Sequence, residues 1–264
     1  MKHIVMFSGG AGSWATAMKV KEQYGTDNLY LVFADTLIED EDLYRFIKES
    51  EKQIGAKLIW LKDGRDVWQV FKDDKFIGNN RIANCSRYLK QRPSRKWLEE
   101  NAKPDECVVY VGIDWTETHR LPAIVNNYLP YTAKAPLCEK PYLDKSEILE
   151  WMSKEGIKPP RLYGMGFAHN NCGGFCVRSG HAQFKKLLEL FPDRYAAHEA
   201  KEEELRKIIG KDVSIMKDRR NKTTKPMTMK QFRERLVEEE NKLDDEDDWG
   251  GCGCFVDNEG TEKQ

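Results

Sequence analysis

The sequence predicts an α/β fold in which a parallel, twisted, Rossmann-like sheet is flanked by helices. Short apolar runs with the character of buried strands alternate with helical patterns along the first half of the chain. This alternation favours right-handed βαβ units and a parallel sheet. The 264 residues are 40% hydrophobic, which is enough for one large domain with an appendage.

The predicted elements follow one another in a regular order. The predicted strands are residues 4–7, 29–34, 57–61 and 107–111. The predicted helices are residues 14–24, 39–54, 92–101, 145–154, 180–190, 195–209 and 227–243. The clearest local signals are Gly55, which ends one helix, and the capping box formed by Asp144 and Glu147, which begins another.

The composition divides the chain into three parts and excludes several protein classes. Residues 1–180 are predicted to form the α/β domain, 181–243 a helical appendage, and 244–264 an acidic, cysteine-containing, mobile tail. A net charge of −1 gives no overall attraction to nucleic acid. The chain has no apolar run long enough to span a membrane and no signal peptide, so we expect a cytoplasmic protein.

The seven cysteines are an odd number and are clustered, which argues against a disulfide framework. Cys172 and Cys176 lie four residues apart, and Cys252 and Cys254 lie two apart. Closely spaced cysteines in a reducing compartment favour metal binding or redox chemistry.

A glycine-rich turn joins the first predicted strand to the first predicted helix. Gly9, Gly10 and Gly12 allow backbone N–H groups to surround an anion at the helix N-terminus, and Ser8 and Ser13 add hydroxyl donors. A tight strand–helix turn without a ligand is the alternative.

Residues 7–13 resemble the PP-loop, Ser-Gly-Gly-x-Asp-Ser, of the N-type ATP pyrophosphatases and the PAPS reductase family. The resemblance implies the adenine nucleotide α-hydrolase fold and a bound adenine nucleotide (PAPS, APS or ATP), with Mg²⁺ left open. Gly12 stands where the pyrophosphatases carry Asp, so the carboxylate that helps organise Mg²⁺ is missing. This departure favours a relative that binds an already activated nucleotide.

Two further segments resemble the same family. Asp35 and Thr36 match its Asp-Thr element at a strand end, where Asp35 would meet a ligand or metal, or only cap the next helix. Gly112, Glu117 and Arg120 match its third element, where Arg120 would bind a phosphate or sulfate, or only pair with Glu117.

Two cysteine segments resemble the segments that ligate a 4Fe–4S cluster in the cluster-containing members of the family. If the ligand positions of these segments are transferred to this chain, the metal ligands are Cys85, Cys172 and Cys176. Asn84 replaces one family cysteine, and the later spacing is Cys-x₃-Cys, so a fourth ligand is left open between a tail cysteine, Cys138, His169, a small thiol and the transferred sulfur. Zinc bound by the three cysteines and His169, and unligated thiols, are the alternatives.

Cationic residues flank the first of these cysteines. In the family interpretation Lys90 or Arg92 lies near the cluster and the anionic substrate, and the alternative is an ordinary helix surface. In the tail, Cys252 and Cys254 are loose analogues of the catalytic tail cysteine of these reductases. They would alternatively complete the cluster or have no role. A basic stretch between Lys211 and Lys230 would contact a nucleotide phosphate or nucleic acid, or be a solvated loop.

The resemblance implies a PAPS/APS reductase-like oxidoreductase of sulfur metabolism that receives electrons from a thiol donor such as thioredoxin. One alternative is an AMP-forming, cluster-dependent sulfurtransferase that thiolates tRNA or DNA. A second is a non-catalytic, zinc-containing nucleotide-binding protein. No membrane partner is expected, and assembly into a homo-oligomer is left open.

Overall fold

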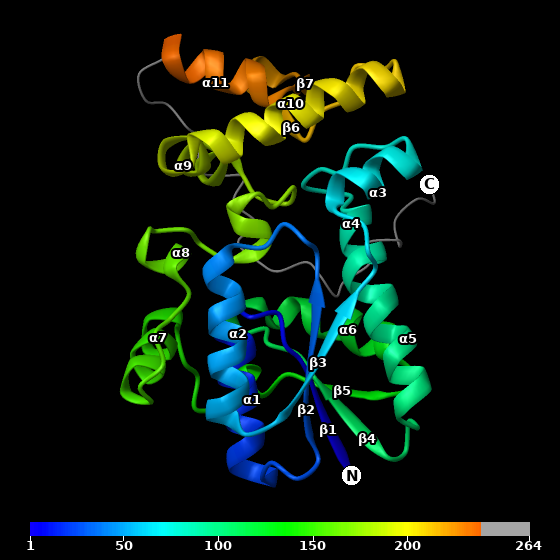
Figure 1. Cartoon of the computed structure of the whole chain (residues 1–264), viewed down its shortest axis with the longest axis vertical. Coiled ribbons are helices and arrows are strands. Elements are labelled where there is room, and N and C mark those ends of the chain that lie inside the picture. Colours follow the sequence, from blue (N-terminus) through cyan, green and yellow to red (C-terminus); the bar gives the residue numbers. More distant parts are fainter. Residues whose placement is uncertain (239–264) are drawn as a thin grey trace.

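A five-stranded parallel sheet forms the centre of the fold, in a computed structural model that describes residues 1–238 (Figure 1). The strand order is β3-β2-β1-β4-β5. The strands are β1 (Lys2–Met6), β2 (Leu29–Asp35), β3 (Lys57–Lys62), β4 (Cys107–Tyr110) and β5 (Thr132–Lys134). The predicted fold class is confirmed. The sequence pattern missed β5, whose three residues are too few to show a period.

The order of the strands reverses at β1, which pairs with β2 on one side and β4 on the other. In open parallel sheets, ligands bind beyond the carboxyl ends of the strands at this switch point. The fold therefore brings the loops after β1, β2 and β4 to one edge of the sheet.

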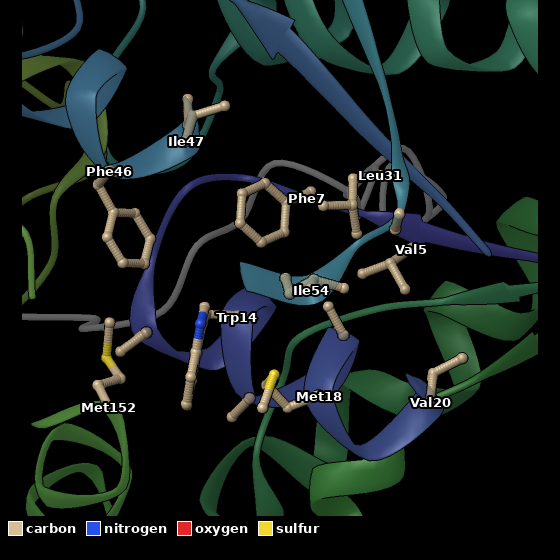
Figure 2. Close-up of a cluster of buried hydrophobic side chains, with 14 of the residues drawn as sticks. Val5, Phe7, Trp14, Met18, Val20, Leu31, Phe46, Ile47, Ile54 and Met152 are labelled. Carbon is tan, nitrogen blue, oxygen red and sulfur yellow. The ribbon is translucent and has the colours of Figure 1, made fainter. Parts of the chain in front are cut away.

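Helices cover both faces of the sheet. One face carries α1 (Ala11–Tyr24), α2 (Glu41–Ile54) and α7 (Lys145–Lys154). The other carries α5 (Arg92–Asn101) and α6 (Leu121–Tyr128). Successive side chains of β1 point to opposite faces of the sheet. Val5 lies in the core under α1 and α2 (Figure 2), and Ile4 lies in the core under α5 and α6.

The local capping signals define two of these helices. Asp144 and Glu147 form the predicted capping box at the start of α7. Gly55, with φ of 75°, ends α2 in the left-handed conformation. Helix α2 begins at Glu41 rather than at the predicted Glu39, because the carboxylate of Asp40 accepts the N–H of Asp42 and caps the helix there.

A second core lies above the carboxyl edge of the sheet, beneath the C-terminal helices (Figure 1). Its elements are α3 (Val67–Asp74), α9 (His181–Leu190), α10 (Pro192–Ile209), α11 (Met229–Glu238), β6 (Met216–Asp218) and β7 (Lys225–Met227). This core draws residues from both sides of the predicted division at residue 180, since Cys85 and Phe175 pack with Phe184 and Tyr195. The predicted tail, 244–264, lies outside the described residues.

Short elements carry several of the predicted site residues. They are α4 (Asn84–Ser86), the π-helix η1 (Arg87–Gln91), η2 (Trp115–Arg120), η3 (Pro136–Cys138), α8 (Arg161–Gly164), η4 (Asn171–Gly174) and η5 (Arg220–Lys222). Within residues 1–238, no helix has both the length and the apolar character needed to cross a bilayer.

Candidate active site

The glycine-rich loop between β1 and α1 has the geometry of an anion-binding turn. Gly9 has a φ of 77°, a conformation that favours glycine, and Gly10 is the N-cap of α1. The Ser13 hydroxyl donates to the Gly10 carbonyl at 2.8 Å, and the Ser8 hydroxyl donates to Ser13 Oγ at 3.3 Å. The first turn of α1 has no acidic residue, so its N-terminus keeps its partial positive charge.

Gly12 is explained by packing against the loop that follows β4. A Cβ atom on Gly12 would lie 2.6 Å from the carbonyl oxygen of Gly112, and one on Gly112 would lie 2.7 Å from the Ser13 nitrogen. The two backbones therefore touch at the switch point of the sheet. A side chain at position 12, including the Asp of the pyrophosphatase loop, requires this contact to open.

Tyr163, which sequence reasoning did not assign to the site, closes the loop from the other side. Its hydroxyl accepts the N–H of Ala11, the first residue of α1, at 3.1 Å. The hydroxyl therefore takes one of the N–H groups that a helix N-terminus offers to an anion. No spacing in the sequence signals this contact, because 152 residues separate the two partners.

Asp35 is a buried carboxylate at the end of β2. It is 2% exposed and accepts hydrogen bonds from the Leu37 N–H at 2.9 Å, Tyr44 Oη at 3.0 Å and Trp60 Nε1 at 3.1 Å. The alternative that Asp35 only caps the following helix is wrong, because Asp40 does so. The bonds to Tyr44 and Trp60 hold β2, α2 and β3 together beside the site.

Arg120 lies in η2, after β4, and is partly buried. Its guanidinium pairs with the carboxylate of Glu117, which is the alternative that the sequence left open. Asp114 begins this short helix by accepting the Thr116 N–H at 2.8 Å. Arg120 and Glu117 thus stand on the same side of the sheet as Gly112, with the arginine charge already balanced by a carboxylate.

The three predicted metal ligands line one pocket, although they come from segments almost ninety residues apart. Cys85, Cys172 and Cys176 all contribute to its wall, together with Lys90 and Thr36. The thiols of Cys172 and Cys176 are in hydrogen-bond contact with each other. The fold therefore brings together the cysteine segments and the Asp-Thr element.

A buried carboxylate, Glu39, joins these parts, and sequence reasoning did not single it out. Its Oε1 accepts the Thr36 hydroxyl at 2.9 Å and lies 3.5 Å from the Lys90 ammonium. Its Oε2 accepts the backbone N–H of Cys172 at 2.6 Å. Glu39 and Lys90 have side chains only 2% and 8% exposed, so the pair is an ion pair inside the protein.

The neighbouring carboxylate, Asp40, holds the same cysteine loop through an arginine. Arg194 donates to the Gly173 carbonyl at 2.6 Å and to Asp40 Oδ2 at 3.1 Å, and Arg161 pairs with both oxygens of Asp40. Cys172 has a φ of 52° and Gly173 a φ of 60°. A left-handed cysteine costs energy and persists only when its surroundings fix it, and the two carboxylates supply that fixing.

Comparison with known proteins identifies the family of this chain. A sequence profile of the phosphoadenosine phosphosulfate reductase domain matches residues 2–172. This chain belongs to that family. The match extends from the first strand to Cys172, so it includes the glycine-rich loop, the Asp-Thr element and two of the three pocket cysteines.

Two similar proteins come from Methanocaldococcus jannaschii and are uncharacterized. Protein MJ0066 is 27% identical over 191 residues, which are 72% of this chain and 39% of that protein. Protein MJ0973 is 25% identical over 196 residues, which are 72% of this chain and 44% of that protein. The chain thus spans about two fifths of the length of these relatives.

A crystal structure of phosphoadenylyl-sulfate (PAPS) reductase from Candida auris, as a phosphate complex, is also similar. It is 14% identical, covers 63% of this chain and 79% of its own, and has a TM-score of 0.45.

The surroundings of Cys85 and Cys172 disfavour the thiolate form of both side chains by raising their pKa. Burial, with the nearby Cys176, raises the pKa of the Cys85 thiol to about 12. The hydrogen bond from Cys176, followed by burial, raises the pKa of Cys172. Lys90 acts in the opposite direction on both. A group that replaces the thiol protons would therefore gain from the lysine charge.

The chemical type of the ligand atoms in the pocket suits an iron–sulfur cluster. Three thiols and a buried cation suit a thiolate-bound cluster, in which each thiolate binds its own iron. Within residues 1–238, no three His, Cys, Asp or Glu side chains are arranged to hold a single metal ion. The open space is about 20 Å³, room for roughly one water molecule. A cluster therefore requires the cysteine side chains or η4 to move outward.

The other predicted ligands lie elsewhere. Cys138 contacts the backbone carbonyl of Asp114 at 3.2 Å, in the region of the loop after β4. His169 Nδ1 lies 3.4 Å from Gln183 Nε2. Neither residue is part of the pocket wall. Cys252 and Cys254 lie outside the described residues, so their predicted roles stay predictions.

Lys90 and Arg92 are placed on different sides of their segment. Arg92 is exposed, stacks over the Tyr88 ring at 4.2 Å and lines a separate hollow. Residues two apart on a helix point in nearly opposite directions, which accounts for the separation. The segment itself is the π-helix η1, in which the Arg92 N–H bonds to the Arg87 carbonyl, five residues back, just before Pro93.

The basic stretch between Lys211 and Lys230 is folded rather than a simple loop. It contains the antiparallel pair β6 and β7. The Arg220 guanidinium, through its hydrogen bond to Asp218, lowers the pKa of that carboxyl to about 2. Part of its positive charge is thus balanced within the hairpin.

Proposed function

We propose that this protein is a PAPS/APS reductase-like enzyme that binds a sulfated adenine nucleotide and reduces its sulfur with a cluster-bearing thiol site. The observation that carries the proposal is the single pocket in which Cys85, Cys172 and Cys176 meet Lys90 and Thr36. Glu39 links this pocket to the motif at the end of β2. Family membership supports the nucleotide and sulfate chemistry.

In this proposal the loop of Ser8–Ser13 binds the phosphate of the nucleotide through backbone N–H groups and the two serine hydroxyls. The Tyr163 hydroxyl gives up the Ala11 N–H when the phosphate arrives. Lys90 places a positive charge where the sulfate of the substrate meets the cysteine pocket. Cys85, Cys172 and Cys176 would hold the cluster, which would supply electrostatic stabilisation beside that sulfate.

The reducing electrons come from thiols. A thiolate of the predicted tail, from Cys252 or Cys254, attacks the sulfate sulfur, so that a sulfur–sulfur bond forms and the bond to the nucleotide phosphate oxygen breaks. A second thiol, from a donor such as thioredoxin or a small thiol, then attacks the cysteine sulfur. Sulfite leaves and a disulfide remains, so two thiols supply the two electrons.

A second candidate is an AMP-forming sulfurtransferase that modifies a nucleic acid. The cationic hollow beside the Cys85 segment favours it, because that surface suits a phosphate backbone. The contact between Gly12 and Gly112 argues against it, because it leaves no room for the Mg²⁺-organising carboxylate of the ATP-cleaving loop.

The experiment is a product assay on anaerobically purified full-length protein with dithiothreitol or thioredoxin. The proposal predicts sulfite release from PAPS or APS, with formation of the nucleotide lacking sulfate. Release of AMP and pyrophosphate from ATP, dependent on tRNA or DNA, would instead establish the sulfurtransferase. Tight nucleotide binding without any turnover, together with bound zinc, would establish a binding protein.

A further inference from the structure

A cationic hollow of about 440 Å³ lies between the start of α5 and the end of α6, apart from the cysteine pocket. Its wall includes Arg87, Gln91, Arg92, Arg95, Lys96 and Glu99. Four cations face one carboxylate, so the wall has a formal charge of about +3, whereas the whole chain has −1. The volume is within the range of ~300–1,000 Å³ typical of ligand sites.

Arg95 holds the two walls of this hollow together. Its guanidinium donates to the carbonyls of Tyr128 at 3.3 Å and Leu129 at 3.1 Å, at the end of α6. It also lies over the Tyr131 ring at 5.1 Å. The carbonyls at a helix C-terminus carry partial negative charge that a cation stabilises. The hollow is therefore built before any ligand arrives.

Two other cations of the wall point outward. The Arg92 guanidinium lies over the Tyr88 ring and is exposed. The Lys96 side chain is 77% exposed and reaches Glu100 at 3.9 Å, the outer limit of an ion pair. An exposed pair of this kind contributes little and is readily exchanged for another anion.

We propose that this hollow binds the phosphodiester backbone of a nucleic acid, without reading its sequence. A single phosphate on exposed cations is screened by salt, and small-anion sites enclose their ligand. A polymer presents many phosphates and gains from the release of their counterions. The π-helix η1 has Arg87 in this hollow and Lys90 in the cysteine pocket, so a bound strand lies along the element that directly follows Cys85 and α4 in the chain.

The inference is independent of the reaction at the cysteines, because it concerns equilibrium binding. The test is fluorescence anisotropy of a labelled RNA hairpin, a DNA duplex and a single DNA strand with the full chain, across a salt series. The variant is Arg92→Ala/Lys96→Ala. The matched control, Lys48→Ala/Lys52→Ala, removes two exposed cations from α2.

We expect the wild-type protein and the control to bind at low salt with equal affinity. The hollow variant should bind roughly tenfold more weakly. Its salt slope should be smaller by about two, because each removed cation neutralises one phosphate in the wild type. Thermal melting that matches the wild type shows that the variant is folded. A preference for RNA or for DNA identifies the polymer.

Three results would overturn the proposal. They are no binding by the wild-type chain, an equal loss in the hollow variant and the control, and competition by pyrophosphate or ATP as strong as that by the polymer. The last result would assign the hollow to a small polyphosphate.

Discussion

The phosphate loop and the cysteine pocket lie at the same edge of the sheet, but different interactions hold them in place. The loop uses backbone groups, two serine hydroxyls and close glycine contacts. The pocket is surrounded by buried charges, with Glu39 and Lys90 on one side and Asp40 with its two arginines on the other. Substitutions should therefore act on the loop through shape and on the pocket through unbalanced charge.

The largest effect is expected for Glu39→Gln. Removing the Glu39 charge breaks a buried ion pair with Lys90, at a cost of about 3–5 kcal/mol in the free energy of unfolding. Urea denaturation measures it. Glu41→Gln, two residues away and exposed, is the control and should be near neutral.

A double variant sharpens this prediction. Glu39→Gln/Lys90→Met removes both members of the ion pair and should recover a large part of the loss, because a buried ion pair replaced as a whole costs far less than one broken by losing a single partner. If the double variant is as unstable as Glu39→Gln, the hydrogen bonds of Glu39 to Thr36 and Cys172 carry the stability, and the charge interpretation of the pocket is wrong.

A smaller effect is expected for Gly12→Ala on the loop side. The new Cβ would meet the Gly112 carbonyl at 2.6 Å, so two backbones must separate, at a cost of about 1–3 kcal/mol. Nucleotide affinity, measured by calorimetry, should fall with it. Gly164→Ala is the matched control, because a Cβ there meets nothing within 4 Å. Unchanged affinity and stability would show that the two motifs are not in contact.

The core above the pocket should weaken in acid. Burial, with the charges of Lys201 and Arg194, lowers the pKa of His198 from 6.5 to about 3, and its Nδ1 accepts a hydrogen bond from Trp68 at 2.9 Å. The unfolded chain therefore takes up this proton first as the pH falls. The contribution to stability is complete above pH 6.5 and is lost progressively toward pH 3.

The measurement is the melting temperature between pH 4 and pH 8 for the wild type and His198→Gln, which keeps an acceptor for Trp68 but does not titrate. The variant should show a shallower decline on the acid side. Equal slopes in the two proteins would mean that His198 is protonated in the folded state without cost.

The smallest effect is expected for Tyr163→Phe. The Ala11 N–H loses its acceptor, which costs about 0.5–1.5 kcal/mol in the absence of ligand. Because the proposed phosphate takes the same N–H, nucleotide affinity should stay the same or rise slightly. A large loss of affinity in calorimetry would instead make Tyr163 a direct ligand of the nucleotide.

The fold and the motifs could be predicted from the sequence because both depend on short segments of the chain. Strand runs, the capping box of Asp144 and the glycine-rich turn each depend on a few consecutive residues. The strand β5 was missed because three residues carry no pattern.

The connections of the site could not be predicted, because they join residues far apart in the chain. Glu39 meets Cys172 across 133 residues, and Asp40 meets Arg194 across 154. Gly12 was explained by ligand chemistry from the sequence, whereas the structure adds a close backbone contact.

The most direct test of the central claim, that the three cysteines form one cluster site, is the iron and acid-labile sulfide content of anaerobically purified protein. It is compared with Cys85→Ser and with Cys138→Ser, whose thiol lies outside the pocket. We predict about four irons and four sulfides per chain in the wild type and in Cys138→Ser, and loss of both in Cys85→Ser. Zinc in place of iron, or the same content in all three proteins, would contradict the account.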